Sequence, residues 1–96
     1  MVHLRIICAT EATDAVLDIL RNDPGAVHVT VLRSVAVDPP GDVVQADVVR
    51  EAADGVLAQL YALGISHHGG ITLESLDTVL SDAADAAAVA APGGPC

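Results

Sequence analysis

Two kinds of apolar spacing alternate along the chain, and they set the order of its secondary structure. Apolar side chains at every second position predict half-buried strands, whereas apolar positions three and four residues apart predict amphipathic helices. The resulting order is strand, helix, strand, strand, helix, strand. The predicted strands are residues 2–8, 26–32, 42–49 and 71–76, and the helical stripes lie within residues 12–20 and 53–60.

Cap and turn residues separate these segments. Thr10 is expected to cap the first helix, and the run Asn22-Asp23-Pro24-Gly25 is expected to end it. Residues 33–41 are expected to connect the two middle strands, and Gly64 is expected to end the second helix in the left-handed conformation.

A short internal repeat indicates two similar halves. Shifting the sequence by 40 positions places Leu4, Ile6 and Cys8 on Val44, Ala46 and Val48. Two strand–helix–strand halves in tandem form the split βαβ arrangement, and right-handed crossovers favour an antiparallel sheet with both helices on one face. The sequence therefore predicts an α+β fold, a ferredoxin-like βαββαβ two-layer sandwich with four strands in the order 4-1-3-2.

The apolar side chains are almost entirely aliphatic, which suits helices packed on a sheet. Hydrophobic residues make up 52% of the 96 residues, and Tyr61 is the only aromatic residue. A chain of this length favours one core, which we assign to residues 1–80. Residues 81–96 shift to Ala, Gly and Pro, and we expect them to form a tail or linker.

The charge is strongly acidic and argues against nucleic-acid binding. The chain has 13 acidic residues, four Arg and no Lys, for a net charge of −9. A nucleic-acid binder needs clustered basic side chains and aromatic stacking platforms, and this chain offers neither. The same charge disfavours adhesion to an anionic membrane surface.

The cysteines and the N-terminus indicate the compartment. Cys8 lies in an apolar run, where we expect a buried thiol, and Cys96 has no neighbouring partner for a disulfide or zinc motif. Neither a signal-peptide pattern nor a bilayer-spanning apolar run is present. The expected location is the cytoplasm, or the cytoplasmic side of a membrane if the chain belongs to a longer protein.

Two groups of residues are candidates for metal binding. His67 and His68 precede a Gly-Gly turn, and they either cap the second helix as part of a polar loop or bind a metal within an oligomer. The predicted strand pairing brings His28 near Gln45 or Asp47. A histidine–carboxylate pair there either binds a metal, responds to pH or forms a hydrogen-bonded surface pair.

The sheet face opposite the helices is a candidate surface for self-association. Its apolar members are expected to be Ile7, Leu32, Val43 and Val49, and Arg5 is expected to approach Asp47. A single layer of helices leaves the other face of a sheet open, and a second copy of the chain can cover it. The other residues expected on this face are His3, His28, Thr30, Gln45, Asp47, Thr72 and Glu74.

No catalytic or cofactor-binding motif is recognisable. The acidic residues on the predicted outer helix faces have no cleft to hold them, and neither a Ser-His-Asp motif nor a phosphate-binding glycine loop occurs. We therefore expect no enzymatic activity and no cofactor, with carboxylate or histidine chemistry as the remaining enzymatic alternative.

Several segments together resemble a known family. Residues 3–7, 13–20, 47–53 and 71–78 are similar to the N-terminal region of the uncharacterised bacterial membrane proteins called domain of unknown function 389. The resemblance covers residues 2–80 and implies that a hydrophobic multi-helix region follows this domain. It transfers no catalytic residues.

These observations predict a non-catalytic regulatory or oligomerisation domain of a membrane-associated protein. The alternative is a small-molecule or metal-sensing module that binds its ligand where two subunits meet, with His28, Asp47, His67 and His68 as the residues to test.

Overall fold

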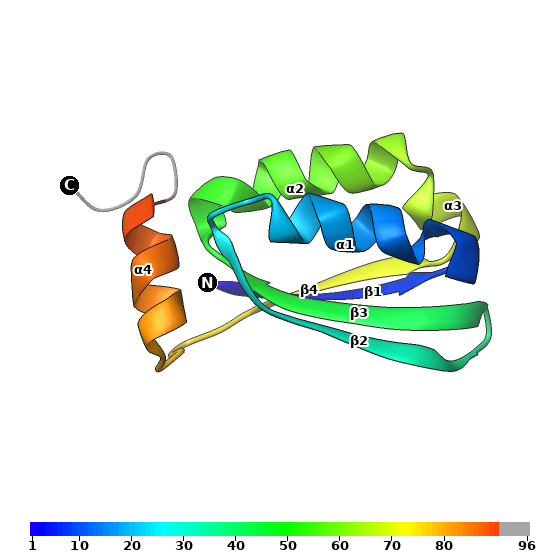
Figure 1. The fold of residues 1–96 in the computed structure, drawn as a ribbon, viewed down its shortest axis with the longest axis horizontal. Coiled ribbons are helices and arrows are strands. Elements are labelled where there is room, and N and C mark those ends of the chain that lie inside the picture. Colours follow the sequence, from blue (N-terminus) through cyan, green and yellow to red (C-terminus); the bar gives the residue numbers. More distant parts are fainter. Residues whose placement is uncertain (91–96) are drawn as a thin grey trace.

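The computed structural model describes residues 1–90, which form a sheet with helices above it and a further helix near the C-terminal end (Figure 1). A 3-10 turn, η1, covers Thr10–Ala12. The strands are β1 (Val2–Cys8), β2 (Ala26–Val37), β3 (Pro40–Val48) and β4 (Gly70–Ser75), and the helices are α1 (Thr13–Arg21), α2 (Arg50–Ala62), α3 (Ile65–His68) and α4 (Asp82–Ala90).

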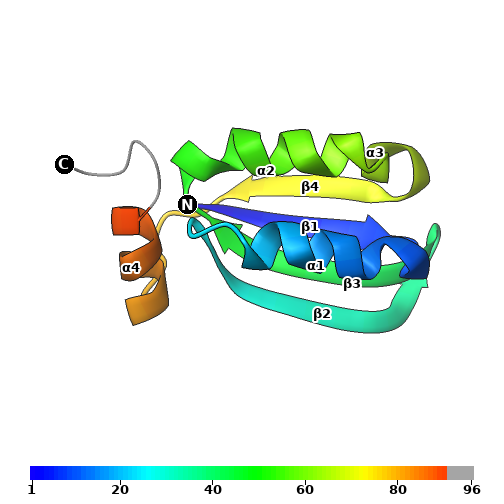
Figure 2. The ribbon, with the colours of Figure 1, turned by 45° about the horizontal axis from the view of Figure 1, so that its top comes forward.

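The four strands form one sheet in the order β2-β3-β1-β4, and all neighbours run antiparallel. Figure 2 shows α1 and α2 over one face of this sheet, while α4 lies beyond its end. The predicted α+β class and the antiparallel four-stranded sheet are confirmed. We call the face turned away from α1 and α2 the open face.

The core lies between the sheet and the helices α1 and α2. Alternate residues of β1 and β3 point towards the helices, so the two triplets that the internal repeat aligned are all buried. Val16 and Leu20 of α1 meet Val56 and Leu60 of α2 in the same cluster. Burial of each such side chain stabilises the fold by about 1.5–3 kcal/mol.

The start of α1 differs from the prediction. Thr10 lies in the 3-10 turn and caps no helix, and α1 begins three residues later at Thr13. The Thr13 side chain is fully buried and bonded to Asp42, which fixes the first turn of the helix against the sheet.

The connector predicted at residues 33–41 is largely strand. β2 continues to Val37 because Ala36 pairs with Gly41 and Val37 pairs with Pro40, which leaves a tight turn at Asp38-Pro39. β-Branched residues in this stretch favour an extended chain.

Strand β2 carries two irregularities that the sequence pattern did not reveal. Its register against β3 shifts between Val27 and Thr30 and again between Leu32 and Ala36. His28 (φ 55°) and Ser34 (φ 58°) have left-handed backbone conformations inside these stretches. Such bulges bend a strand and redirect the side chains they contain.

The segment after α2 is helical for one more turn. Gly64 has φ 75°, so the predicted left-handed end of α2 is confirmed. His67 and His68 lie in α3 and not in a loop. Gly69 follows, and its backbone passes so close to the Ile7 carbonyl that a β-carbon there would overlap it.

Helix α4 occupies part of the segment predicted as a tail or linker. Ala84 and Ala87 are buried, and Ala87 belongs to the hydrophobic core cluster. Residues 91–96 of that segment, which include Cys96, lie outside the described residues. None of the helices within residues 1–90 is long and apolar enough to cross a membrane.

Candidate functional site

Three strands bring polar side chains together at one end of the open face. The register pairs His3 of β1 with Asp47 of β3, and β2 passes on the other side of β3. Because residues opposite each other in adjacent strands point to the same face, His3 and Asp47 share the open face. Gln45 lies two positions before Asp47 on the same face.

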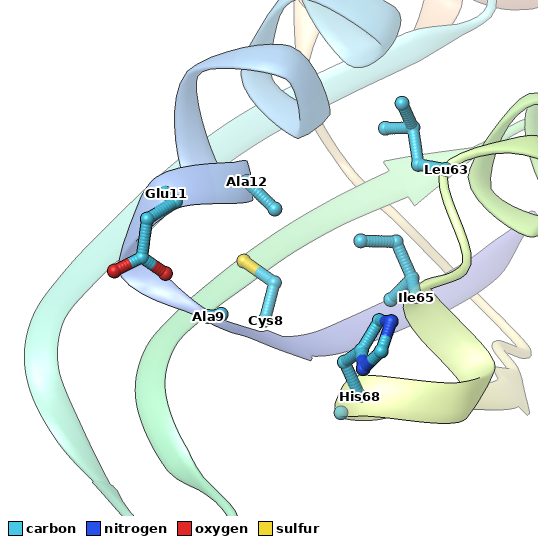
Figure 3. A pocket seen from close by; sticks show the side chains of 8 residues that line it. Cys8, Ala9, Glu11, Ala12, Leu63, Ile65 and His68 are labelled. Carbon is cyan, nitrogen blue, oxygen red and sulfur yellow. The ribbon is translucent and has the colours of Figure 1, made fainter.

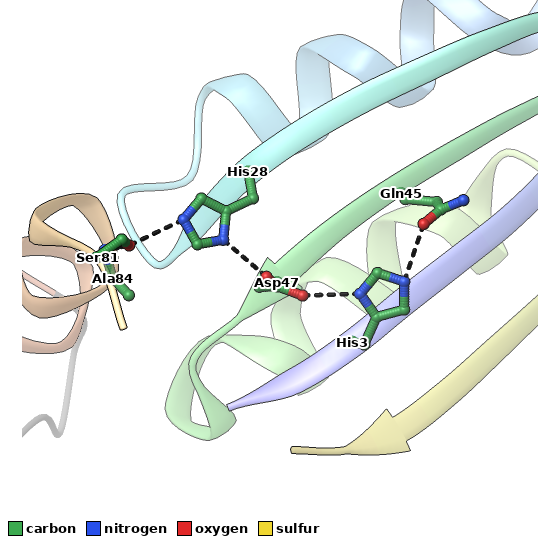
Figure 4. Close-up of polar contacts among 6 residues, drawn as sticks. All are labelled: His3, His28, Gln45, Asp47, Ser81 and Ala84. Atoms are coloured by element: carbon green, nitrogen blue, oxygen red, sulfur yellow. Dashed lines mark hydrogen bonds and ion pairs between the residues drawn. The ribbon is translucent and has the colours of Figure 1, made fainter. Parts of the chain in front are cut away.

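Asp47 is held by two histidines (Figure 4). His3 Nδ1 lies 2.7 Å from Asp47 Oδ1, and His28 Nδ1 lies 2.7 Å from Asp47 Oδ2. The predicted approach of His28 to Asp47 is confirmed, whereas His3 was not expected in this pair. Arg5 instead pairs in register with Gln45, and the ion pairs found within residues 1–90 do not include one between Arg5 and Asp47.

The irregularity of β2 explains how His28 reaches Asp47. The β2–β3 register runs from Val27↔Asp47 directly to Thr30↔Gln45, so His28 and Val29 form a bulge without a partner. The left-handed backbone at His28 turns its imidazole towards the carboxylate. Positive φ is uncommon outside glycine, which makes this residue a local strain point.

Asp47 stays ionised in this setting. Burial alone would raise the pKa of its carboxyl group, but hydrogen bonds from His28 and His3 outweigh burial and hold the pKa below its ordinary value. The side chain is 15% exposed. The carboxylate is therefore a fixed negative charge that orients both imidazole rings.

The histidine bonds extend outward to further polar side chains. His3 Nε2 lies 3.1 Å from Gln45 Oε1, and His28 Nε2 lies 2.9 Å from Ser81 Oγ. Ser81 Oγ also accepts a 2.9 Å bond from the Ala84 N–H, so Ser81 caps α4. Sequence reasoning placed Ser81 in the tail and missed it. A serine directly before an Ala-rich stretch is the signal that could have revealed this helix cap.

A shallow cavity of about 200 Å³ lies next to this network on the open face. Arg5 and Glu74 contribute opposite charges to its wall, and His3 belongs to both the network and the cavity. The complete lining is His3, Arg5, Gln45, Thr72 and Glu74.

The other histidine candidates lie elsewhere. His67 and His68 belong to α3, near the end of β1 that holds Cys8, whereas His28 and Asp47 lie near the opposite end at His3. His68 borders a mainly apolar cavity of about 250 Å³ together with Cys8 and Ile65 (Figure 3). Within residues 1–90, no three His, Cys, Asp or Glu side chains are grouped so that they could hold a metal ion.

Cys8 is a structural thiol. Burial raises the pKa of Cys8, and its sulfur lies 3.5 Å from the Thr13 hydroxyl. A thiol that resists ionisation is a poor nucleophile and a poor metal ligand. The prediction of a buried Cys8 is confirmed.

No family model matches the chain, and no curated protein matches its sequence.

Proposed function

We propose that the chain is a ferredoxin-like βαββαβ domain that self-associates through its open face and regulates or assembles a membrane-associated protein. The strand order, read from β4, is 4-1-3-2, which supports the fold assignment. Helices α1 and α2 lie over the same face, so the opposite face is left for a partner (Figure 2).

One observation carries this proposal: an apolar row crosses the open face. Leu32 of β2 pairs with Val43 of β3, and Val43 pairs with Ile7 of β1. Their neighbours Val31, Val44 and Ile6 point the other way, into the core or against it. Leu32 is 49% exposed, and Ile7 and Val43 are half-buried. Val49, expected in this row, is instead buried in the core.

The open face is suited to a symmetric pair. Its apolar row lies at the end of β1 near Cys8, and its polar network lies at the other end near His3. A second copy related by a two-fold axis can bury one apolar row against the other. The polar groups then stay at the rim, where bound water satisfies them.

The link to a membrane protein rests on the resemblance of residues 2–80 to the membrane-protein family named above. In that setting the domain lies on the cytoplasmic side, and its pairing brings two membrane regions together. The genomic reading frame tests this part. It should encode apolar helices after residue 96, and a stop codon there contradicts the membrane link without touching the self-association.

Self-association is tested by native mass spectrometry and light scattering over a concentration series. We expect a homodimer whose dissociation constant can be measured. A chain that stays monomeric at the highest concentration contradicts the proposal.

A second candidate function is small-molecule sensing, and the cavity beside His3 favours it. Arg5 and Glu74 offer opposite charges across this cavity, so a small ligand with both a carboxylate and an ammonium group fits its chemistry. We expect such compounds to raise the melting temperature of the wild type and not that of Arg5→Gln. An unchanged melting temperature across a panel of amino acids and related metabolites contradicts this function.

A further inference from the structure

His28 joins a serine hydroxyl to a carboxylate in one line (Figure 4). Ser81 Oγ lies 2.9 Å from His28 Nε2, and His28 Nδ1 lies 2.7 Å from Asp47 Oδ2. The three residues come from the start of α4, from β2 and from β3. Their separation in sequence explains why no motif revealed them.

The hydrogen bonds allow one direction of proton donation along this line when His28 is uncharged. Ser81 Oγ already accepts a bond from the Ala84 N–H, so its own hydrogen is free to point at His28. Asp47 is an ionised acceptor, so an uncharged His28 donates its Nδ1–H to Asp47 and presents the Nε2 lone pair to Ser81. A histidine in this tautomer can remove the proton of the serine hydroxyl.

The surrounding residues hold this arrangement in place. His3 bonds the other oxygen of Asp47, so the carboxylate cannot rotate away from His28. His28 keeps its orientation through a left-handed backbone at φ 55°, in a bulge that breaks the β2–β3 register. A simple surface hydrogen bond does not require such strain, and strained residues of this kind concentrate at functional sites.

We propose that Ser81 is a nucleophile, activated by His28 and Asp47, that accepts the acyl group of uncharged carboxylic esters. The Ser81 Oγ forms a bond to the carbonyl carbon while the bond from that carbon to the leaving alkoxide or phenolate breaks. The hydroxyl proton passes to His28 Nε2 and then to the leaving group. The products are O-acyl Ser81 and an alcohol or phenol.

The charge around Ser81 determines which esters can react. Asp82 and Asp85 lie in the first turn of α4, and the whole chain has a net charge of −9. Anionic acyl donors are repelled by this field, whereas uncharged esters are not. The His28 side chain is 36% exposed and Ser81 is partly exposed, so a small ester can reach the hydroxyl.

Acylation also has a structural consequence. An acyl group on Ser81 removes the hydrogen that bonds to His28 and crowds the cap of α4. We therefore expect modified protein to hold α4 less firmly. This inference goes beyond the self-association of the open face, which requires no chemistry at Ser81.

The test uses p-nitrophenyl acetate on the folded wild-type protein, with acid quenching and peptide mapping of acetylated serines. Ser75 is the internal reference, because its hydroxyl is exposed and bonded to Arg50 and not to a histidine. We expect acetylation of Ser81 to be about a hundredfold faster than that of Ser75, since general base catalysis contributes about 10²–10⁴-fold.

Two variants separate activation from position. Asp47→Asn should slow acetylation of Ser81 about tenfold or more while Ser75 is unaffected, and hydrogen exchange of the α4 amides shows whether the helix stays docked. Leu73→Ala changes a side chain on the opposite face of the sheet from the network and should leave both rates unchanged. Equal rates at Ser81 and Ser75 in the folded wild type overturn the proposal, and the bonds then serve only to hold α4.

Discussion

The Thr13 hydroxyl donates a 2.6 Å hydrogen bond to Oδ2 of Asp42, and this bond joins the first turn of α1 to β3 inside the protein. Asp42 is fully buried, and its other oxygen accepts a 2.7 Å bond from the Ser34 N–H of β2. Nη1 of the Arg33 guanidinium lies 3.8 Å from Asp42 Oδ2. A buried carboxylate is tolerated because α1 and β2 together satisfy it.

Asp42 makes the stability of the fold depend on pH. The hydrogen bond from Thr13, followed by that from Ser34, holds the pKa of Asp42 below its ordinary value of about 3.9. A lowered folded-state pKa contributes stability above the unfolded pKa, and that stability is lost as pH falls through the folded value. The Asp42→Asn variant should therefore have a melting temperature several degrees below that of the wild type at pH 7. The difference between the two melting temperatures should narrow below about pH 4.

Thr13 variants separate the hydrogen bond from the packing. Thr13→Val keeps the shape and removes the donor, whereas Thr13→Ser keeps the donor and removes a methyl group. Only Thr13→Val should weaken the acid dependence of the melting temperature. If the melting temperatures of the wild type and Thr13→Val differ by the same amount at every pH, the proposed role of this bond is contradicted.

Two glycines should respond in opposite ways to the same substitution. A β-carbon at Gly69 would overlap the backbone carbonyl of Ile7, whereas a β-carbon at Gly55 on the exposed side of α2 meets nothing within 4 Å. We expect Gly55→Ala to raise the free energy of unfolding by about 0.5–1 kcal/mol. Gly69→Ala should lower it, because β1 and the start of β4 must separate.

Urea denaturation of the two glycine variants measures both effects. A stabilised Gly69→Ala protein would mean that the approach of Gly69 to β1 is looser than the structure shows. A destabilised Gly55→Ala protein would mean that this side of α2 contacts a partner.

The sequence predicts the sheet because alternation of polarity is local. The spacing of Leu4, Ile6 and Cys8 requires no knowledge of the rest of the chain, and neither does the repeat of that spacing in β3. The left-handed Gly64 was predictable for the same reason, since its position follows from the end of the helical stripe.

The candidate site was only partly predictable, because it depends on bulges and on distant contacts. The strand pairing suggested that His28 lies near Asp47. The alternating pattern of β2 gave no sign of the bulge and the left-handed backbone conformation at His28. Ser81 comes 53 residues after His28, and its hydroxyl enters the network only because α4 packs beside β2. Thr13 and Asp42 were not singled out, because their bond joins two residues that lie 29 positions apart in the chain.

Ser81 should also control how firmly α4 is held. Ser81→Ala removes the cap on the Ala84 N–H and the bond to His28 together. Loss of a serine cap costs about 1 kcal/mol, and the helix has few large side chains to compensate. Hydrogen exchange of the α4 amides should become about fivefold faster or more, while exchange in β1 changes little.

Ser75→Ala is the matched control for this measurement. It removes a serine hydroxyl bonded to Arg50 at the end of β4, so α4 exchange should remain at the wild-type rate. Unchanged α4 exchange in Ser81→Ala would show that Ala84 and Ala87 hold the helix without the polar network.

A pair of leucines tests the open face as the surface of self-association. Leu32 and Leu73 lie on the two edge strands, at 49% and 44% exposure, but they point to opposite faces. Leu32 lies beside Val43 in the apolar row, and Leu73 pairs with the core residue Leu4. Leu32→Asp places two like charges against each other in the proposed dimer interface. Leu73→Asp adds the same charge outside that interface.

We expect Leu32→Asp to raise the dissociation constant of the dimer about tenfold or more. The unpaired buried charge and the lost apolar contact each weaken the free energy of dimerisation by more than about 1 kcal/mol. Leu73→Asp should leave the dimer unchanged, provided circular dichroism shows that both variants fold. Equal weakening by the two substitutions would indicate a general loss of stability. If Leu73→Asp alone dissociates the dimer, the partner binds at the β4 edge and the open face serves another purpose, with the cavity beside His3 as its functional centre.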